Sequence, residues 1–234
     1  MCNTVLFELT LLISSGIVFL CIAVSGQFYI WQHIEPRKAP MHDVMFNLLP
    51  DLSADKTPYP NFVFIAMLFI ALLAFPRKKI FQLIAQYAFL QGLLSAVRGI
   101  VVAATLLPLA DVDPACSEKP KDLIEALLVL LELGSCGDYL FSGHTVSAML
   151  LYLFTTKHGT YYCFQFIQGL LLGLMMLTLL LFRWHYTIDI IIALFVSFLF
   201  FHVYKEYERN SHWYYFKSFV IGADIKYKSV STNP

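Results

Sequence analysis

Long apolar segments separated by short polar ones are the feature that most restricts how this chain can fold. Several of these runs approach or exceed the ~20 residues with which an α-helix crosses the hydrocarbon core of a bilayer. Only 14% of the 234 residues are charged, against roughly 25% in soluble domains, and the mean hydropathy is +0.68. These values predict an all-α, polytopic membrane protein. The net charge of zero gives no sign of nucleic-acid binding.

We expect six spanning helices in a single membrane domain that comprises residues 1–234. They cover residues 7–30, 61–75, 80–107, 143–156, 161–182 and 186–204. The proline-rich segment 31–60 is expected to be a loop. The segment 108–143 carries seven acidic residues and two lysines, and the apolar spacing within 122–133 predicts an amphipathic helix at the membrane surface.

Charges at the predicted helix ends indicate the orientation. Six spans place both termini on one side, and that side has nine basic residues against three acidic ones. The basic residues are Arg77, Lys78, Lys79, Lys157, Lys205, Arg209, Lys217, Lys226 and Lys228. The positive-inside rule therefore predicts cytosolic termini, with a short cytosolic tail over 205–234. Segments 31–60, 108–143 and 183–185 then face the lumen or the exterior.

Two polar clusters, 136–145 and 185–189, lie at this non-cytosolic face. His185 and Asp189 are four residues apart at the predicted start of a helix, so their side chains share one face. The carboxylate can accept one ring N–H and leave the other ring nitrogen as a nucleophile. Taken alone, this spacing more often indicates a structural hydrogen-bonded pair, which remains the alternative.

The first cluster has the elements of an anion site. Gly143 lets a ligand approach the backbone, and the amides of a helix start beside the Ser142 hydroxyl favour an anion. His144 can act as a general acid toward a leaving alkoxide. Arg98 lies 18 residues past Ile80, or ~27 Å along a helix, level with the histidines and able to hold a phosphodiester. The set predicts phosphoryl transfer through a phosphohistidine.

Other interpretations of these residues stay open. Arg98 could extend to lipid headgroups instead of a substrate. His144, His185 and Asp189 could bind a metal, but no Cys or Glu spacing supports this, so we predict neither metal nor cofactor. Cys116 and Cys136 share the non-cytosolic loop and could form a disulfide or remain thiols. The catalytic interpretation is favoured because ionisable residues near membrane spans are costly and these all map to one face.

The two clusters resemble the signature motifs of the sphingomyelin synthase family, within the phosphatidic acid phosphatase type 2 (PAP2) superfamily. The matching stretches are Cys136-Gly137-Asp138-x-Leu140-Phe141-Ser142-Gly143-His144-Thr145 and His185-Tyr186-Thr187-Ile188-Asp189. Leu49-Pro50-Asp51 with Pro58 resembles a first-loop motif, and 98–108 resembles a second motif. The resemblance covers about 45–205, the expected catalytic core, and implies a six-helix PAP2-like bundle.

This resemblance implies a catalytic triad of His144, His185 and Asp189. Family members transfer a phospho-headgroup from a glycerophospholipid to ceramide in a ping-pong reaction that releases diacylglycerol. His185 would be the nucleophile, oriented by Asp189, and His144 would act as acid and then as base. Arg98, Asp138, Ser142 and Gly143 would bind the substrate. The resemblance implies the Golgi or plasma membrane as the location and lipids as the partners, and a homo-oligomer is compatible with it.

The headgroup is predicted less sharply than the reaction. Arg183-Trp184 stands where mammalian-type members have His-Glu, and an arginine there is similar to inositol-phosphate-transferring relatives. Ile188 fits the sphingomyelin-making form. Phosphocholine is the expected headgroup, with phosphoethanolamine and phosphoinositol as alternatives. Competing functions are a lipid phosphate phosphatase or phospholipase C-like hydrolase, and a catalytically inactive membrane scaffold.

Overall fold

The computed structural model of the protein describes residues 41–55, 57–105, 120–125 and 140–209, and positions 10, 14, 16–18, 21–22, 24–26, 28–29 and 32–33. All regular secondary structure in these parts is helical, as predicted. The elements are α2 (Val44–Leu48), α3 (Tyr59–Ala74), the 3-10 helix η1 (Arg77–Lys79), α4 (Ile80–Ala104), α6 (Gly143–His158), α7 (Tyr162–Leu181) and α8 (Thr187–Arg209).

Local sequence signals account for most helix ends. Pro60 occupies the second position of α3, where its missing N–H has no helical acceptor to lose, and Pro76 follows the end of the same helix. The Ser142 side chain caps α6 by accepting from the Thr145 amide. Helix α8 is an exception, because it continues to Arg209 and the predicted tail boundary at 205 falls inside it. Residues 205–209 contain no glycine or proline, so nothing in the local sequence ends the helix there.

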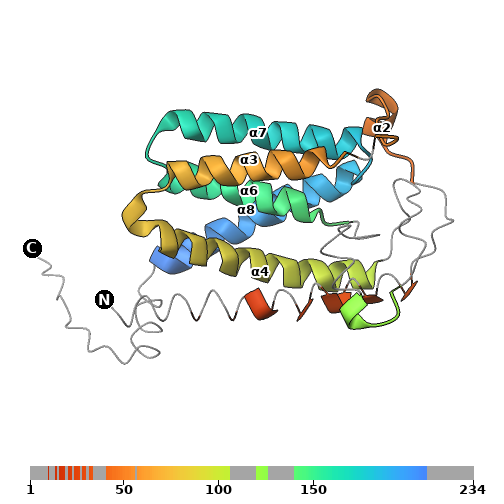
Figure 1. Ribbon diagram of the computed structural model, residues 1–234, viewed down its shortest axis with the longest axis horizontal. Helices are drawn as coiled ribbons and strands as arrows, with labels where there is room; N and C mark the ends of the chain where they lie inside the picture. Colours follow the sequence, from red (N-terminus) through yellow and green to blue (C-terminus); the bar gives the residue numbers. More distant parts are fainter. Residues whose placement is uncertain are drawn as a thin grey trace, which may run out of the picture.

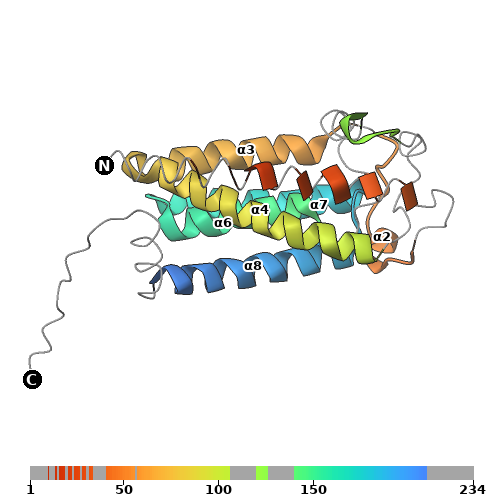
Figure 2. The same ribbon diagram turned by 90° about the horizontal axis from the view of Figure 1, so that it is seen from below.

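The helices form a bundle in which α3, α6, α7 and α8 run lengthwise and α4 lies along one side (Figures 1 and 2). The α3–α4 and α6–α7 connections are at one end, with Arg77, Lys78, Lys79 and Lys157 (Figure 1). Helix α2, the start of α6 and the α7–α8 turn are at the opposite end. Both histidine clusters therefore lie at the end remote from these four basic residues.

Among the described residues, three helical segments are long and apolar enough to cross a membrane, Arg77–Ala104, Tyr162–Leu181 and Thr187–Glu206. Helices α3 and α6 have 16 residues each, which gives ~24 Å, short of the ~30 Å hydrocarbon core. Half of the positions of the predicted first span, 7–30, are described, and all of these are helical. Of the predicted surface helix, 122–133, only 122–125 are described. Three of the six predicted spans are thus confirmed by length and composition.

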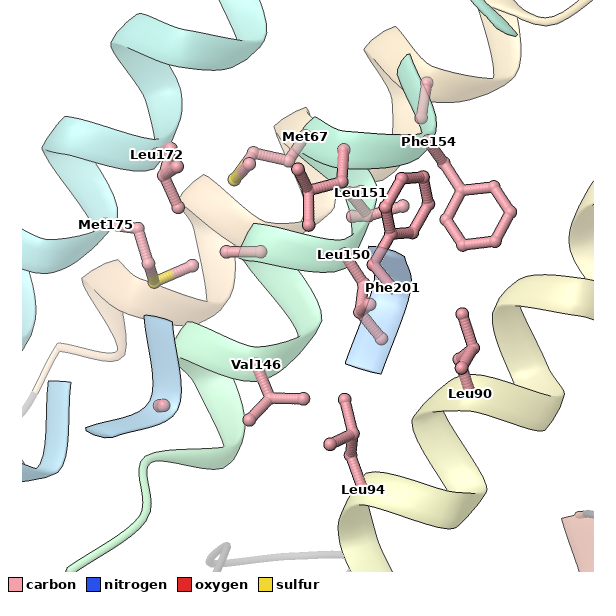
Figure 3. Close-up of a cluster of buried hydrophobic side chains, with 14 of the residues drawn as sticks. Met67, Leu90, Leu94, Val146, Leu150, Leu151, Phe154, Leu172, Met175 and Phe201 are labelled. Carbon is pink, nitrogen blue, oxygen red and sulfur yellow. The ribbon is translucent and has the colours of Figure 1, made fainter. Parts of the chain in front are cut away.

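Helix α6 is at the centre of the apolar core (Figure 3). Its buried residues Val146, Leu150 and Phe154 pack among side chains from the surrounding helices. The amide of the buried Gln168 on α7 donates to the Met67 carbonyl of α3 at 2.9 Å. Between membrane helices such packing and hydrogen bonds replace the hydrophobic effect as the cohesive force.

Large apolar side chains also point away from the bundle. Phe166 on α7, Phe195 on α8 and Phe69 on α3 are 69%, 67% and 61% exposed. Surfaces of this composition are unfavourable in water over such an extent, and they match the acyl chains of a bilayer. The outward faces therefore support the assignment of the bundle to a membrane.

Candidate active site

The segment before α6 is held in an unusual backbone conformation. Leu140 has φ 78°, in the left-handed region that costs a non-glycine residue of order 1–2 kcal/mol. Its amide donates to Asp189 Oδ1 at 2.7 Å. Two residues later the Ser142 amide donates to the Asp189 carbonyl at 3.4 Å. The first cluster is thus tied to the second by both the side chain and the backbone of Asp189.

Asp189 also organises the start of α8. Its side chain is fully buried, and Oδ2 accepts from the Tyr186 amide at 3.0 Å. An acid at the third helical position that accepts from the residue before the helix is one half of a capping box. His185 precedes α8 by two residues. It lies in the predicted 183–185 turn, but the prediction that it shares a helical face with Asp189 is wrong. The capping turn, not a helical face, brings it to Asp189.

His185 is held by this carboxylate. Its Nδ1 lies 3.3 Å from Asp189 Oδ2, and the residue is 4% exposed. Because a carboxylate only accepts, the bond places the proton on Nδ1 and the lone pair on Nε2. Burial lowers the pKa of His185, the Asp189 hydrogen bond opposes that shift, and the charge of Arg98 adds to the lowering. The neutral form with a nucleophilic Nε2 is therefore favoured at neutral pH.

Arg98 reaches the same place from α4. Its Nε donates to the Phe141 carbonyl at 2.8 Å. A Cβ on Gly143 would lie 3.2 Å from both Cζ and Nη1 of Arg98, so the guanidinium rests against the glycine backbone. Only glycine leaves this room without displacement. The structure places the positive charge of Arg98 beside the first turn of α6.

The start of α6 has donors available. Ser142 Oγ accepts from the Thr145 amide and hydroxyl, at 3.2 and 3.0 Å, and is completely buried. Its hydroxyl thus fixes the helix start from inside the bundle. Among the described residues, the amides of Gly143 and His144 donate to no acceptor. With Arg98 adjacent, they form a positively charged site suited to a phosphate group.

His144 completes the group and has a partner that the sequence did not suggest. Its Nε2 lies 2.9 Å from Oδ1 of Asn61, in the first turn of α3. Its ring meets the edge of Trp184 at 5.6 Å between centroids. Arg98 and His185 are both close enough to act on it electrostatically. The structure thus brings together His144, His185, Asp189 and Arg98.

The first loop forms a second set of contacts that sequence reasoning missed. Asp43 accepts from the Thr187 amide and hydroxyl, both at 2.7 Å, and from the Met45 amide at 2.9 Å. Burial raises the pKa of Asp43, but these hydrogen bonds outweigh it and the net shift is downward. The Met41 amide donates to the hydroxyl of the buried Tyr186 at 3.0 Å. The only signal in the sequence was the aspartate itself, next to a hydrophobic stretch.

Arg183 faces the first loop. Its Nη2 donates to the Phe46 carbonyl at 2.7 Å, and the guanidinium lies 4.0 Å over the Phe46 ring. Its Nε is 3.6 Å from Asp51 Oδ2. The residue is buried and its backbone is left-handed, with φ 56°. Arg183 therefore anchors the segment 46–51 to the α7–α8 turn.

Several predicted residues lie outside the described part of the chain. Asp138, Cys116 and Cys136 are among them, so their predicted roles stay predictions. The predicted first-loop motif contributes Asp51 through its contact with Arg183. Within the described residues, no group of three or more His, Cys, Asp or Glu side chains is arranged to hold a metal ion.

Sequence comparisons agree with the motifs. A family model described as "PAP2 superfamily C-terminal" matches residues 135–206, which include both histidine clusters. The chain is 24% identical over 200 residues to phosphatidylcholine:ceramide cholinephosphotransferase 1 of Caenorhabditis elegans, across 76% of this chain and 43% of that protein. It is 31% identical over 127 residues to phosphatidylcholine:ceramide cholinephosphotransferase 2 of Homo sapiens, across 48% and 35%.

A relative with a different headgroup in its name is also similar. Phosphatidylinositol:ceramide inositolphosphotransferase 3 of Arabidopsis thaliana is 27% identical over 208 residues, across 78% of this chain and 68% of that protein. The matched segments span less than half the length of the worm and human relatives. The comparisons confirm the predicted resemblance as a similarity in sequence: residues 135–206 match the PAP2 superfamily C-terminal model, and the chain is similar to proteins named as ceramide phosphotransferases.

Proposed function

We propose that this protein transfers a phospho-headgroup from a glycerophospholipid to ceramide, with phosphocholine as the expected headgroup. The observation that carries the proposal is the Asp189 carboxylate, which binds His185 Nδ1 and the Leu140 amide together. This bond directs the lone pair of His185 to Nε2, and it ties the nucleophile to the cluster that contains His144. A purely structural pair would not require a second histidine and an arginine beside it.

In the first half-reaction, His185 Nε2 attacks the phosphorus of the donor lipid. The bond between phosphorus and the glyceryl oxygen breaks, the electron pair leaves with that oxygen, and the His144 imidazolium protonates it to give diacylglycerol. Arg98 and the first amides of α6 stabilise the negative charge on the phosphoryl oxygens. The product on the enzyme is a phosphohistidine that carries the headgroup.

In the second half-reaction, neutral His144 takes the proton of the primary hydroxyl of ceramide. The resulting alkoxide attacks the phosphorus, and the bond to His185 Nε2 breaks with return of the electron pair to the ring. Each histidine is then back in its starting state. A water molecule in place of ceramide would give the phosphatase or phospholipase C-like alternative.

We further propose six spans with the histidine end facing the lumen or exterior and both termini in the cytosol, in the Golgi or plasma membrane. The separation of Arg77, Lys78, Lys79 and Lys157 from the histidine clusters supports this orientation. Protease protection of a tag inserted after Lys157 tests it. Cleavage of that tag from the lumenal side would refute the orientation.

The function is tested with purified protein and labelled phosphatidylcholine, phosphatidylethanolamine or phosphatidylinositol, each with and without ceramide. We expect ceramide-dependent product and an equal amount of diacylglycerol with one donor. Release of a free headgroup irrespective of ceramide would identify a hydrolase, and no turnover with any donor would favour the inactive scaffold. His185→Ala must abolish turnover, and full activity in that variant would contradict the mechanism for every substrate.

A further inference from the structure

The contact between Asn61 and His144 is unusual for its surroundings. Asn61 lies in the first turn of α3, and its side chain is exposed. Its neighbours on the helix, Phe62 and Val63, are apolar. Nevertheless its Oδ1 lies 2.9 Å from His144 Nε2, across 83 residues of sequence. An exposed amide that reaches a histidine of the candidate site calls for an explanation beyond packing.

We propose that Asn61 is the positioning residue of His144: its amide oxygen holds Nε2–H and thereby presents Nδ1 as the atom that exchanges protons with the substrate. This inference rests on the proposed function of the site. An amide oxygen is only an acceptor, so the bond requires a proton on Nε2 in both charge states of the ring. In the neutral ring the lone pair is then on Nδ1.

The two histidines are held in different ways, and the difference matches their different tasks. His185 is held through Nδ1 by a carboxylate, which favours a basic, nucleophilic Nε2. His144 is held through Nε2 by a neutral amide. A neutral partner stabilises the imidazolium much less than a carboxylate does. His144 can therefore cross between acid and base within one catalytic cycle, as the two half-reactions require.

Other residues around His144 also influence its protonation and its orientation. Among the described residues, Arg98 comes from α4 and His185 from the α7–α8 turn. The charge of Arg98, and that of His185 whenever its ring is protonated, opposes protonation of His144. Trp184 packs edge-on against the ring at 5.6 Å and restricts its rotation. Asn61 is thus the one described partner that favours a proton on a defined nitrogen of His144.

The test is a pH–rate series on the purified protein. Asn61→Ala should lower kcat about tenfold with little change in KM, because a misoriented acid forfeits part of a contribution of 10²–10⁴-fold. Asn61→Asp is nearly isosteric and adds a charge. It should move the pH limbs of kcat/KM for both lipids upward by about one unit or more, because the imidazolium gains a carboxylate partner. Asn61→Gln keeps the neutral amide acceptor, so the pH limbs of this variant should lie closer to those of the wild type than the limbs of Asn61→Asp do.

The chain offers a matched control. The Nδ2 of Asn47 lies 3.0 Å from Nε2 of His42, another exposed Asn–His pair, outside the candidate site. Asn47→Ala should leave both the rate and the pH limbs unchanged. A role of Asn61 in folding alone would lower the yield of active protein at every pH without moving the limbs. Unshifted limbs in Asn61→Asp would overturn the inference while leaving the transfer reaction intact.

A second readout does not depend on turnover. The ¹⁵N chemical shifts of labelled His144 distinguish Nε2–H from Nδ1–H. We expect the Nε2–H form in the wild type and a mixture in Asn61→Ala, with no change in Asn47→Ala. An unchanged tautomer in Asn61→Ala would refute the inference whichever substrate the protein uses. Failure to form any ceramide product, by contrast, would count against the proposed function.

Discussion

Replacement of Asp189 by asparagine separates the two tasks of this carboxylate. In the wild type, Oδ1 accepts from the Leu140 amide at 2.7 Å, while Oδ2 accepts from the Tyr186 amide at 3.0 Å and from His185 at 3.3 Å. An asparagine has one acceptor oxygen and one NH₂ group. If the oxygen keeps the two bonds on the α8 side, the NH₂ faces the Leu140 amide, and two donors meet.

The size of the effect follows from these three bonds. The part-buried Leu140 amide left without an acceptor costs about 1–3 kcal/mol, and loss of charge weakens each of the other two bonds by about 1 kcal/mol. We therefore expect the stability to fall by roughly 3–5 kcal/mol. For a chain of this length that corresponds to a melting temperature lower by about 10 °C. Loss of the tautomer control over His185 should lower turnover by on the order of 10³–10⁴-fold.

Asp43→Asn is the matched control for this change. Asp43 is also buried and also accepts three hydrogen bonds, two of them from Thr187 at the start of α8. In detergent micelles the Asp43→Asn variant should show a decrease in melting temperature of the same order. Its turnover per folded molecule should stay within about tenfold of wild type, because Asp43 contacts neither histidine. An equal loss of turnover in both variants at equal folded fraction would refute the orienting role of Asp189.

Further predictions concern the neighbours of this carboxylate. Gly143→Ala places a methyl group 3.2 Å from the Arg98 guanidinium; we expect turnover to fall at least tenfold with a thermal shift of only a few degrees, measured on the same samples. Arg183→Ala should expose segment 46–51 to faster hydrogen exchange, because it removes the bond to Phe46 and the contact with Asp51; unchanged exchange there would contradict an anchoring role. Because the pKa of Asp43 is lowered in the folded protein, its contribution to stability is present above about pH 4 and is lost as the pH falls further. The melting temperature should therefore be flat from pH 7 to 5 and drop below pH 4. In Asp43→Asn this drop should be less steep.

Much of the fold follows from the sequence because its signals are local. The start of α3 is encoded by Pro58 and Pro60, and that of α6 by the Ser142 cap. The placement of the two histidine clusters at one end required only an alternation of apolar runs with short turns. The same alternation puts Arg98, about five turns along α4, at the level of the histidines, where the structure shows it in contact with Phe141. These inferences need no knowledge of which helices touch.

The contacts that were missed depend on tertiary packing. Asn61 meets His144 only because α3 packs beside α6, and no periodicity in the sequence specifies that neighbour. Asp43 lies in a proline-rich segment, where its bonds to Thr187 leave no local signature. The position of His185 before α8, not on it, results from the capping bond of Asp189 to Tyr186. In the first two cases a polar group far away in sequence decides the local geometry, and in the third a capping bond between near neighbours does so.

The distinction between an enzyme and an inactive scaffold rests on residues with no structural task. Asp189 joins two chain segments and caps a helix, so a scaffold would retain it for stability alone. Arg183 and Asp43 likewise hold the first loop in place. His144 and Asn61 are different, because their contact lies at the surface of the bundle end and connects groups that the core does not need. The contact serves chemistry if both alanine variants keep the wild-type melting temperature while turnover is lost in His144→Ala and falls about tenfold in Asn61→Ala. If both variants lose stability instead, the pair is a surface clamp between α3 and α6, and this contact does not distinguish an enzyme from a scaffold.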